Sequence, residues 1–162
     1  MRTILLAAAA LLVSGSAALA APASVSVAIG PKLQAKAEKT YGVRDVRDLA
    51  DRLQKEVART LTRTGAYDGA RLELVLADAV PNRPTFKQLS DTPGLSYQSF
   101  GVGGAAIEGR IVAADGTVTP VSYSYYEPDI RYAAQNWTWH DADWTFGRLA
   151  SKLGRAEVVA NR

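Results

Sequence analysis

The sequence of 162 residues contains no cysteine, one histidine and one methionine. Without cysteine the chain forms no disulfide, has no thiol nucleophile and carries no lipid on a cysteine near its start. A single histidine excludes zinc sites built from several imidazoles, and a Ser-His-Asp triad would depend on that one residue, His140. Packing alone must therefore hold the fold, and few catalytic chemistries have the residues they need.

An excess of either charge is also lacking. The chain has 19 Lys and Arg residues against 16 Asp and Glu residues, and the two signs are interspersed. This balance argues against a nucleic-acid partner or a strongly anionic surface as partner. Hydrophobic residues make up 48% of the chain, which excludes a wholly disordered protein.

Long hydrophobic runs are absent except at the N-terminus. Ten apolar residues, 4–13, follow Arg2 and precede the small-residue segment Ala18-Leu19-Ala20. The run is shorter than the roughly 20 apolar residues of a membrane-spanning helix. The pattern predicts a signal peptide over residues 1–20 that is cleaved after Ala20, and hence a soluble, periplasmic chain without a stable membrane anchor.

Hydrophobic periodicity predicts two amphipathic helices. The first covers 45–64, with Asp45 as its cap and Gly65 at its end, and the second covers 138–153, beginning in a capping box of Thr138 and Asp141. The expected buried stripes are Val46, Leu49, Ala50, Leu53, Val57 and Leu61 in the first helix, and Trp139, Ala142, Phe146, Leu149, Ala150 and Leu153 in the second.

Alternating hydrophobic residues predict strands at 25–29, 71–77, 107–113 and 117–126, with a further short strand at 95–100. Asp115-Gly116 predicts a hairpin turn, and Pro120 predicts that its strand lies at an edge or contains a bulge. The expected fold class is α+β: an antiparallel sheet of about four strands with two amphipathic helices packed on one face.

The domain organisation follows from these elements. We expect a signal peptide at 1–20, an N-terminal strand and connecting segment at 21–44, a single α+β domain at 45–155 and a C-terminal tail at 156–162.

The glycines of Gly101-Val-Gly103-Gly104 superficially match the dinucleotide-binding fingerprint. That motif needs a helix after the glycines, whereas residues 107–112 have the pattern of a strand. We therefore expect no cofactor, and a close approach of backbones or a bulge at these glycines.

Two catalytic interpretations stay open as alternatives. His140 with Asp143 one turn away could serve acid–base chemistry or weak cation binding, although aspartates at a helix start also simply favour its dipole. A pair among the carboxylates Glu73, Glu108, Glu127 and Asp129 could act as in a glycosidase. We expect neither a metal nor a catalytic residue, and regard an enzyme as the alternative.

Aromatic residues are unevenly distributed, since eight of the thirteen lie between Tyr123 and Phe146. On a helical wheel Trp144 lies nearly opposite the buried stripe, with His140 and Gly147 on its side. Three interpretations remain open: the 127–137 loop folds over Trp144, a partner protein or second copy docks there, or a sugar or peptide stacks on it.

The candidate interface therefore comprises His140, Trp144 and Gly147, with Phe86 and Tyr97 of the 81–100 loop as a second contact. The leading hypothesis is a periplasmic binding or assembly module that docks an envelope protein or self-associates. The alternatives are a glycan-directed envelope hydrolase using His140 or a carboxylate pair, and a small sugar- or peptide-binding protein. The sequence leaves the specific activity, the partner and the oligomeric state open.

Three segments carry a resemblance to other proteins: Pro81-Asn-Arg-Pro-Thr-Phe-Lys-Gln-Leu89, Phe100-Gly-Val-Gly-Gly-Ala105 and Trp139-His-Asp-Ala-Asp143. With them the chain resembles uncharacterised signal-peptide-bearing envelope proteins of Gram-negative bacteria, a domain of unknown function related to cell-envelope lipoproteins. The resemblance implies an envelope location and an α+β domain, and it supplies no catalytic residue. The chain departs from the lipoproteins because it lacks their lipid-bearing cysteine.

Overall fold

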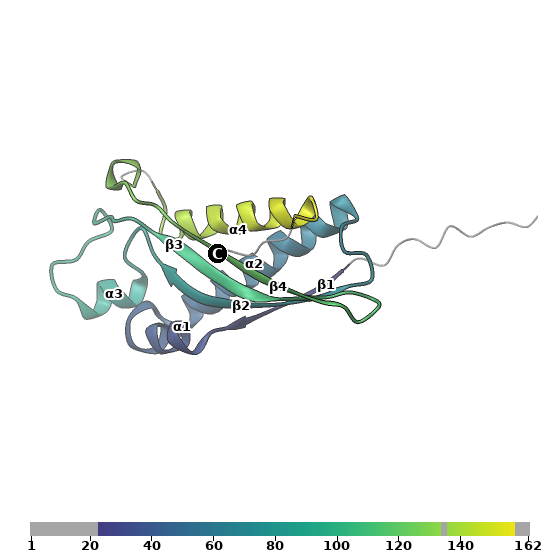
Figure 1. The fold of residues 1–162 in the computed structure, drawn as a ribbon. Helices are drawn as coiled ribbons and strands as arrows, with labels where there is room; N and C mark the ends of the chain where they lie inside the picture. Colours follow the sequence, from purple (N-terminus) through teal and green to yellow (C-terminus); the bar gives the residue numbers. More distant parts are fainter. Residues whose placement is uncertain (1–22, 134–135, 158–162) are drawn as a thin grey trace, which may run out of the picture.

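A computed structural model of the chain describes residues 23–133 and 136–157 (Figure 1). The predicted signal peptide and residues 158–162 of the predicted tail lie outside these residues. The elements in chain order are β1 (Ser24–Ile29), α1 (Pro31–Lys36), the π-helical segment η1 (Ala37–Tyr41), α2 (Val43–Thr64), β2 (Arg71–Val80), α3 (Phe86–Asp91), β3 (Gly104–Val112), β4 (Val118–Tyr126), the 3-10 turn η2 (Ile130–Tyr132) and α4 (His140–Gly154). None of the described helices is both long enough and apolar enough to cross a membrane.

The four strands form one sheet in the order β1-β2-β3-β4. The strands β2, β3 and β4 are successive antiparallel neighbours, whereas β1 runs parallel to β2. The sheet is therefore mixed, and the prediction of a purely antiparallel sheet is wrong in this respect. The reason is the connection: β1 reaches β2 through α1 and α2, and a helical crossover returns the chain to the same end of the sheet.

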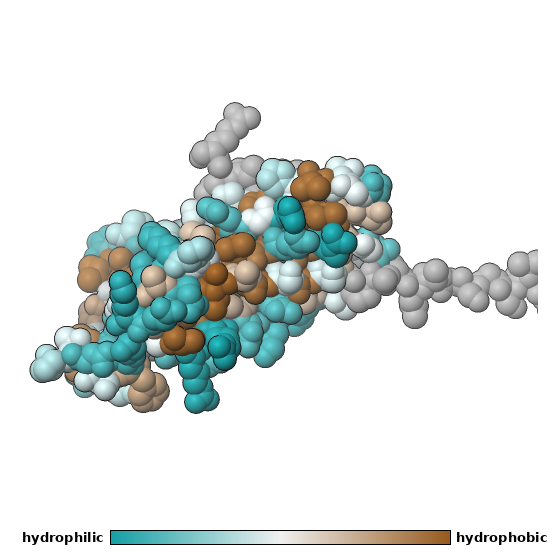
Figure 2. Space-filling view, turned by 90° about the horizontal axis from the view of Figure 1, so that it is seen from below, coloured by the Kyte–Doolittle hydropathy of each residue, from teal (hydrophilic) through white to brown (hydrophobic). Residues whose placement is uncertain are grey.

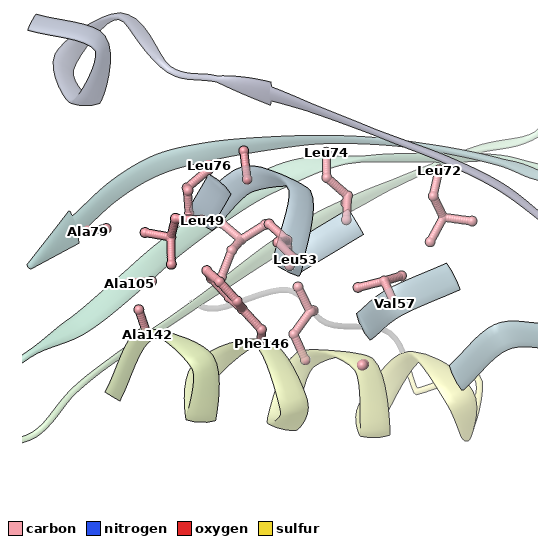
Figure 3. Packing of buried hydrophobic residues seen from close by; sticks show 14 of the residues in the cluster. Leu49, Leu53, Val57, Leu72, Leu74, Leu76, Ala79, Ala105, Ala142 and Phe146 are labelled. Carbon is pink, nitrogen blue, oxygen red and sulfur yellow. The ribbon is translucent and has the colours of Figure 1, made fainter. Parts of the chain in front are cut away.

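The fold class is α+β, as predicted, and its core lies between the sheet and the two long helices. Figure 3 shows α2 and α4 on the same side of the sheet, with Phe146 reaching from α4 toward Leu49 and Leu53 of α2 and toward the strands. All twelve residues of the two predicted helical stripes are buried. The strands contribute the alternate residues Leu72, Leu74 and Leu76 of β2 to the same core.

Both long helices begin differently from the prediction. α2 starts at Val43, two residues early, after Gly42 with φ 95°, and Asp45 caps nothing. α4 starts at His140 without any side-chain cap, so the capping box of Thr138 and Asp141 is wrong. The cause is that the Asp141 carboxylate is buried against other loops, as described below. Gly65 ends α2 in the left-handed conformation, as expected.

Some of the connections between elements form as the sequence predicts, and others do not. The predicted hairpin is confirmed, with Gly116 at φ 86° between β3 and β4, and Pro120 lies on the edge strand β4. The predicted strand at 95–100 is wrong, since this segment forms turns and extended loop. The regular secondary structure near this segment is α3, whose N-terminus has a complete capping box of Thr85 and Gln88.

The glycines before β3 allow backbones to approach closely, as predicted. A Cβ atom on Gly104 would lie 2.2 Å from the carbonyl oxygen of Tyr125, and one on Gly103 would lie 2.6 Å from the Asn82 side-chain oxygen. No side chain fits at either position without displacing its neighbours. Gly104 allows β3 and β4 to approach each other, and Gly103 allows the Asn82 side chain to lie under the strand.

The second face of the sheet is not covered by α2 or α4. Figure 2 views the molecule from this side and shows a hydrophobic band along its middle, flanked by hydrophilic side chains. Small residues such as Ser26 and Ala28 line a shallow hollow of about 630 Å³ there, together with Glu73, Glu108 and Arg110. The Glu73 and Arg110 side chains form an ion pair across β2 and β3.

Candidate binding surface

Both long loops of the chain leave the sheet at the same end. Val80 at the end of β2 pairs with Gly104 at the start of β3, and Gly104 pairs in turn with Tyr126 at the end of β4. The segments 81–103 and 127–139 therefore emerge at one end of the sheet, which is also where α4 begins (Figure 1).

Exposed large hydrophobic side chains concentrate around these loops. Eleven large hydrophobic side chains are exposed among the described residues. Ten of them lie at this end of the sheet and its helices or in the two loops, and only Val118 lies at the other end. The ten are Val43, Phe86, Tyr97, Phe100, Val102, Tyr126, Ile130, Tyr132, Trp137 and Trp144. We call this region the aromatic end. A patch of this kind marks an interaction surface in many soluble proteins.

Phe86 and Tyr97 form an exposed pair at the aromatic end. Their side chains are 74% and 54% exposed, and their rings meet edge to face with centroids 5.9 Å apart. Arg83 fixes the loop that carries Tyr97, because its Nη1 donates to the Tyr97 carbonyl at 2.8 Å and its Nε donates to the Asn136 carbonyl at 2.5 Å. The two long loops are thus joined through one guanidinium group.

A buried polar network holds the same loops on the start of α4. The Asp141 Oδ2 accepts hydrogen bonds from the Asn82 side-chain amide at 2.6 Å and from the Gly103 backbone N–H at 2.9 Å, and its Oδ1 accepts from the Asn136 side chain at 3.2 Å. The Asn82 oxygen in turn accepts from the Asp141 backbone N–H at 3.0 Å. Both Asn82 and Asp141 are almost fully buried. Asp141 therefore has a structural role that its position at a helix start did not reveal.

His140 packs against Trp137 at the start of α4. The two rings meet edge to face with centroids 4.1 Å apart, and the Trp137 indole N–H donates to Asp143 Oδ2 at 3.0 Å. The same carboxylate oxygen accepts from Arg52 Nη1 of α2 at 2.7 Å. Burial raises the pKa of Asp143, while the hydrogen bond from Trp137 and the charges of Arg52 and His140 oppose that rise.

The Trp144 side chain is partly covered, and one of the residues that cover it belongs to a strand. The ring contacts Tyr125 of β4 edge to face at 4.8 Å, and the Arg148 guanidinium lies 3.8 Å from its centre. The side chain keeps 44% of its surface exposed, and Gly147 beside it faces open space. The aromatic residue of the 127–137 loop that packs on α4 is Trp137, and it contacts His140.

The five predicted interface residues therefore fall into two groups. Phe86 and Tyr97 lie together at the aromatic end, next to the loop junction made by Arg83. Trp144, which also belongs to the aromatic end, and Gly147 form the second group, further along α4 on its exposed side. His140 lies at the boundary, because it starts α4 and supports Trp137.

A groove of about 280 Å³ lies between α2 and α4. Its lining includes Arg52, Lys55 and Arg59 from α2 and Asp143 from α4. Glu56, which also lines it, forms an ion pair with Arg59. Two carboxylates therefore share one groove with three cationic groups.

Three of the four carboxylates that the sequence suggested have other partners, and the fourth, Glu108, lines the same hollow as Glu73. Glu73 pairs with Arg110, Asp129 pairs with Arg131, and Glu127 accepts a hydrogen bond from the Tyr125 hydroxyl at 2.8 Å. Among the described residues no group of three or more His, Cys, Asp and Glu side chains has the geometry to hold a metal ion.

Sequence reasoning missed Asn82, Arg83 and Trp137, which organise this surface. Asn82 and Arg83 bond to residues 14 to 59 positions away, which no local spacing encodes, and the bond of Trp137 to Asp143 depends on the path of its loop. One signal was available in the sequence. The polar residue Asn82 comes directly after the buried strand and the Val80-Pro81 segment that ends it. Comparison of the chain with models of protein families, with curated proteins and with solved structures gives no match, so these roles come from the contacts alone.

Proposed function

We propose that the exported chain is a periplasmic binding or assembly module that docks a protein of the cell envelope through its aromatic end. The observation that carries the proposal is the gathering of exposed aromatic side chains at one end of the sheet, with one exposed large hydrophobic residue described at the other. Export and envelope location rest on the predicted signal peptide and on the resemblance described above.

The composition of the aromatic end supports a protein partner. Trp, Tyr and Arg dominate the binding energy of protein interfaces, and Tyr97, Tyr132, Trp137 and Arg83 all belong to this region. The Trp137 side chain is 56% exposed, and its indole N–H already donates a hydrogen bond to Asp143. A partner can therefore cover the ring without leaving a polar atom unpaired.

Site-specific photocrosslinking tests the proposal. A benzophenone side chain at Phe86, and separately at Tyr97, is compared in the periplasm with the same group at Val118, the exposed hydrophobic residue at the opposite end (57% exposed). We expect one envelope protein to crosslink from both aromatic-end positions and not from Val118. The purified crosslinked protein should then bind the chain, and Phe86→Ser should weaken that binding.

Two results would contradict this function. One is the same set of crosslinked proteins from Val118 as from Phe86, which would indicate random collisions. The other is a purified candidate partner whose affinity is the same for the native chain and for Phe86→Ser.

A second candidate function, glycan hydrolysis, is favoured by one observation. Asp143 and Glu56 line the same groove, and burial raises the pKa of Asp143, as a general acid requires. Release of reducing ends from purified cell-wall glycan measures this activity. Loss in Asp143→Asn and Glu56→Gln, with retention in Glu108→Gln on the far sheet face, would support the enzyme over the docking module.

A further inference from the structure

One edge of the sheet has unpaired backbone groups. The Ser24 N–H donates to the Ala70 carbonyl at 3.1 Å, and the Gly30 N–H donates to the Leu76 carbonyl at 2.9 Å. Even-numbered residues of β1 therefore direct their N–H groups toward β2, and the alternation of a strand directs those of Val25, Val27 and Ile29 outward. Among the described residues, none of the hydrogen bonds of turns, loops and caps uses these three N–H groups.

The β1 edge lacks the usual features that prevent strands from pairing. Its sequence, Ser-Val-Ser-Val-Ala-Ile, contains no charged residue and no proline. The irregularity in the sheet lies in β2, between Leu76 and Asp78, and leaves β1 regular. The other edge strand, β4, contains Pro120, which has no N–H to offer. Natural sheets commonly protect their edges with charges, prolines or bulges, so β1 is the edge open to another strand.

We propose that β1 pairs antiparallel with β1 of a second copy, about a two-fold axis at Val27. In this register Val27 faces Val27 of the second copy, and Val25 faces Ile29 of the second copy. Each opposed pair exchanges two backbone hydrogen bonds, so the three pairs form about six. The two sheets then become one eight-stranded sheet. This inference goes beyond the proposed docking function, and it assigns a surface to the self-association that the sequence left open.

The uncharged sequence of β1 and its alternation of exposed and half-buried side chains fit a second copy as the occupant. Along the edge, N–H and C=O groups alternate in partial charge, and a two-fold antiparallel copy places each donor opposite an acceptor. Because β1 carries no charged side chain, self-pairing opposes no like charges within the strand. The half-buried side chains of Val25, Val27 and Ile29 pack against the core, so pairing extends the same apolar layer into the second copy. Ser24, Ser26 and Ala28 are exposed and small, and they extend the open face without a clash.

Proline at position 27 tests the role of the outward N–H. Because that N–H points away from β2, Val27→Pro removes the donor that the second copy needs, and it also replaces the Val27 side chain. The matched control is Val27→Ala, which shortens the side chain and keeps the N–H. By sedimentation velocity of the exported protein we expect the native chain and Val27→Ala to dimerise. Loss of two bonds of about 1 kcal/mol each in Val27→Pro should weaken the dimer about 30-fold or more.

Engineered cysteines test the register without depending on the proline variant. The chain has no cysteine of its own, so only introduced thiols can react. The proposed register places Ser26 opposite Ala28 of the second copy in a close, non-hydrogen-bonded pair, within disulfide distance. We expect the double variant Ser26→Cys, Ala28→Cys to form a covalent dimer on mild oxidation. The control is Ser122→Cys, Ser124→Cys, which has the same spacing on the same face of β4.

The outcomes separate this inference from the docking function. A native chain that stays monomeric at about 100 µM, an unchanged dimer in a folded Val27→Pro, or equal oxidation of the β1 and β4 cysteine variants would each overturn β1 pairing. Phe86→Ser should leave the dimer unchanged. Loss of envelope crosslinks with an intact dimer would therefore overturn the aromatic-end proposal alone.

Discussion

The two ends of the molecule are built in opposite ways. One end consists of short turns, with Gly65 ending α2 and Gly116 turning the β3–β4 hairpin, both at positive φ and both in open space. The aromatic end consists of two long loops held by Asn82 and Asp141, which are buried. Local backbone preferences specify the first end, whereas contacts between distant segments specify the second. Substitutions should therefore affect the two ends by different mechanisms and to different extents.

The largest difference is expected for glycine substitutions. Gly104→Ala at the aromatic end would bring a Cβ to 2.2 Å from the Tyr125 carbonyl oxygen, so we expect a loss of more than about 3 kcal/mol in the free energy of unfolding. Gly116→Ala has space and should cost about 1 kcal/mol for its left-handed φ. Urea denaturation followed by circular dichroism measures both. Equal losses at the two positions would remove the contrast.

Aspartate substitutions should show the next largest difference. Asp141→Ala removes the acceptor of the Gly103 N–H and one of the two acceptors of the Asn82 amide, and we expect it to cost about 3 kcal/mol. Asp115→Ala in the hairpin turn removes only an exposed bond to the Thr117 N–H and should cost less than about 1 kcal/mol. Trp137 fluorescence, in a variant lacking the other two tryptophans, should report loosening of the loops in the first case only. Unaltered Trp137 emission in Asp141→Ala would argue against the network as the support of this end.

Acid should weaken the protein through Asp78, near the aromatic end of β2. Burial alone would raise the pKa of Asp78, but hydrogen bonds from Lys32 and Lys36, at 2.9 and 2.6 Å, outweigh it and lower the pKa. A carboxyl with a lowered folded-state pKa contributes stability above its unfolded value of about 3.9, and this contribution disappears as pH falls through the folded value. Asp78→Asn should therefore flatten the loss of stability below about pH 4. Glu73→Gln, in an exposed pair with Arg110, is the control and should change that slope less.

The smallest effect on stability is expected at the exposed aromatic pair. Phe86→Ser and Tyr97→Ser remove side chains that are mostly in solvent, so the free energy of unfolding should change by no more than about 0.5 kcal/mol. Val118→Ser is the counterpart at the turn end and should be equally neutral. A loss of several kcal/mol in Phe86→Ser would show that this ring is part of the packing and not a free contact surface.

The contrast between the ends also explains what the sequence could predict. The apolar stripes of α2 and α4 and the Asp115-Gly116 hairpin follow from periodicity and turn chemistry, and both are confirmed. The 95–100 segment alternates like a strand but has no neighbouring strand to pair with, and it forms a loop. The parallel pairing of β1 with β2 depends on where the helical crossover returns the chain.

The sequence predicted single residues of the candidate surface, but not how they are arranged. The sequence left open whether Trp144 is exposed or covered by a loop, and it is partly exposed, because its side of α4 faces away from the core. The pairing of Phe86 with Tyr97 and the support of Trp137 by Asp143 depend on loops whose paths are set by Arg83 and Asn82. The paths of these loops are set by the folded structure, and composition and spacing do not encode them.

The Asn82–Asp141 network has a further consequence, which concerns the entropy of binding. The backbone of the 81–103 loop is tied at Asn82, at Gly101 and at Gly103, and Asn136 ties the other loop to the same carboxylate. Loops restrained in this way lose little conformational freedom when a partner covers them, so more of the contact energy appears as affinity. A substitution in this buried network would then weaken binding by releasing motion in the free protein, although none of its atoms touches the partner.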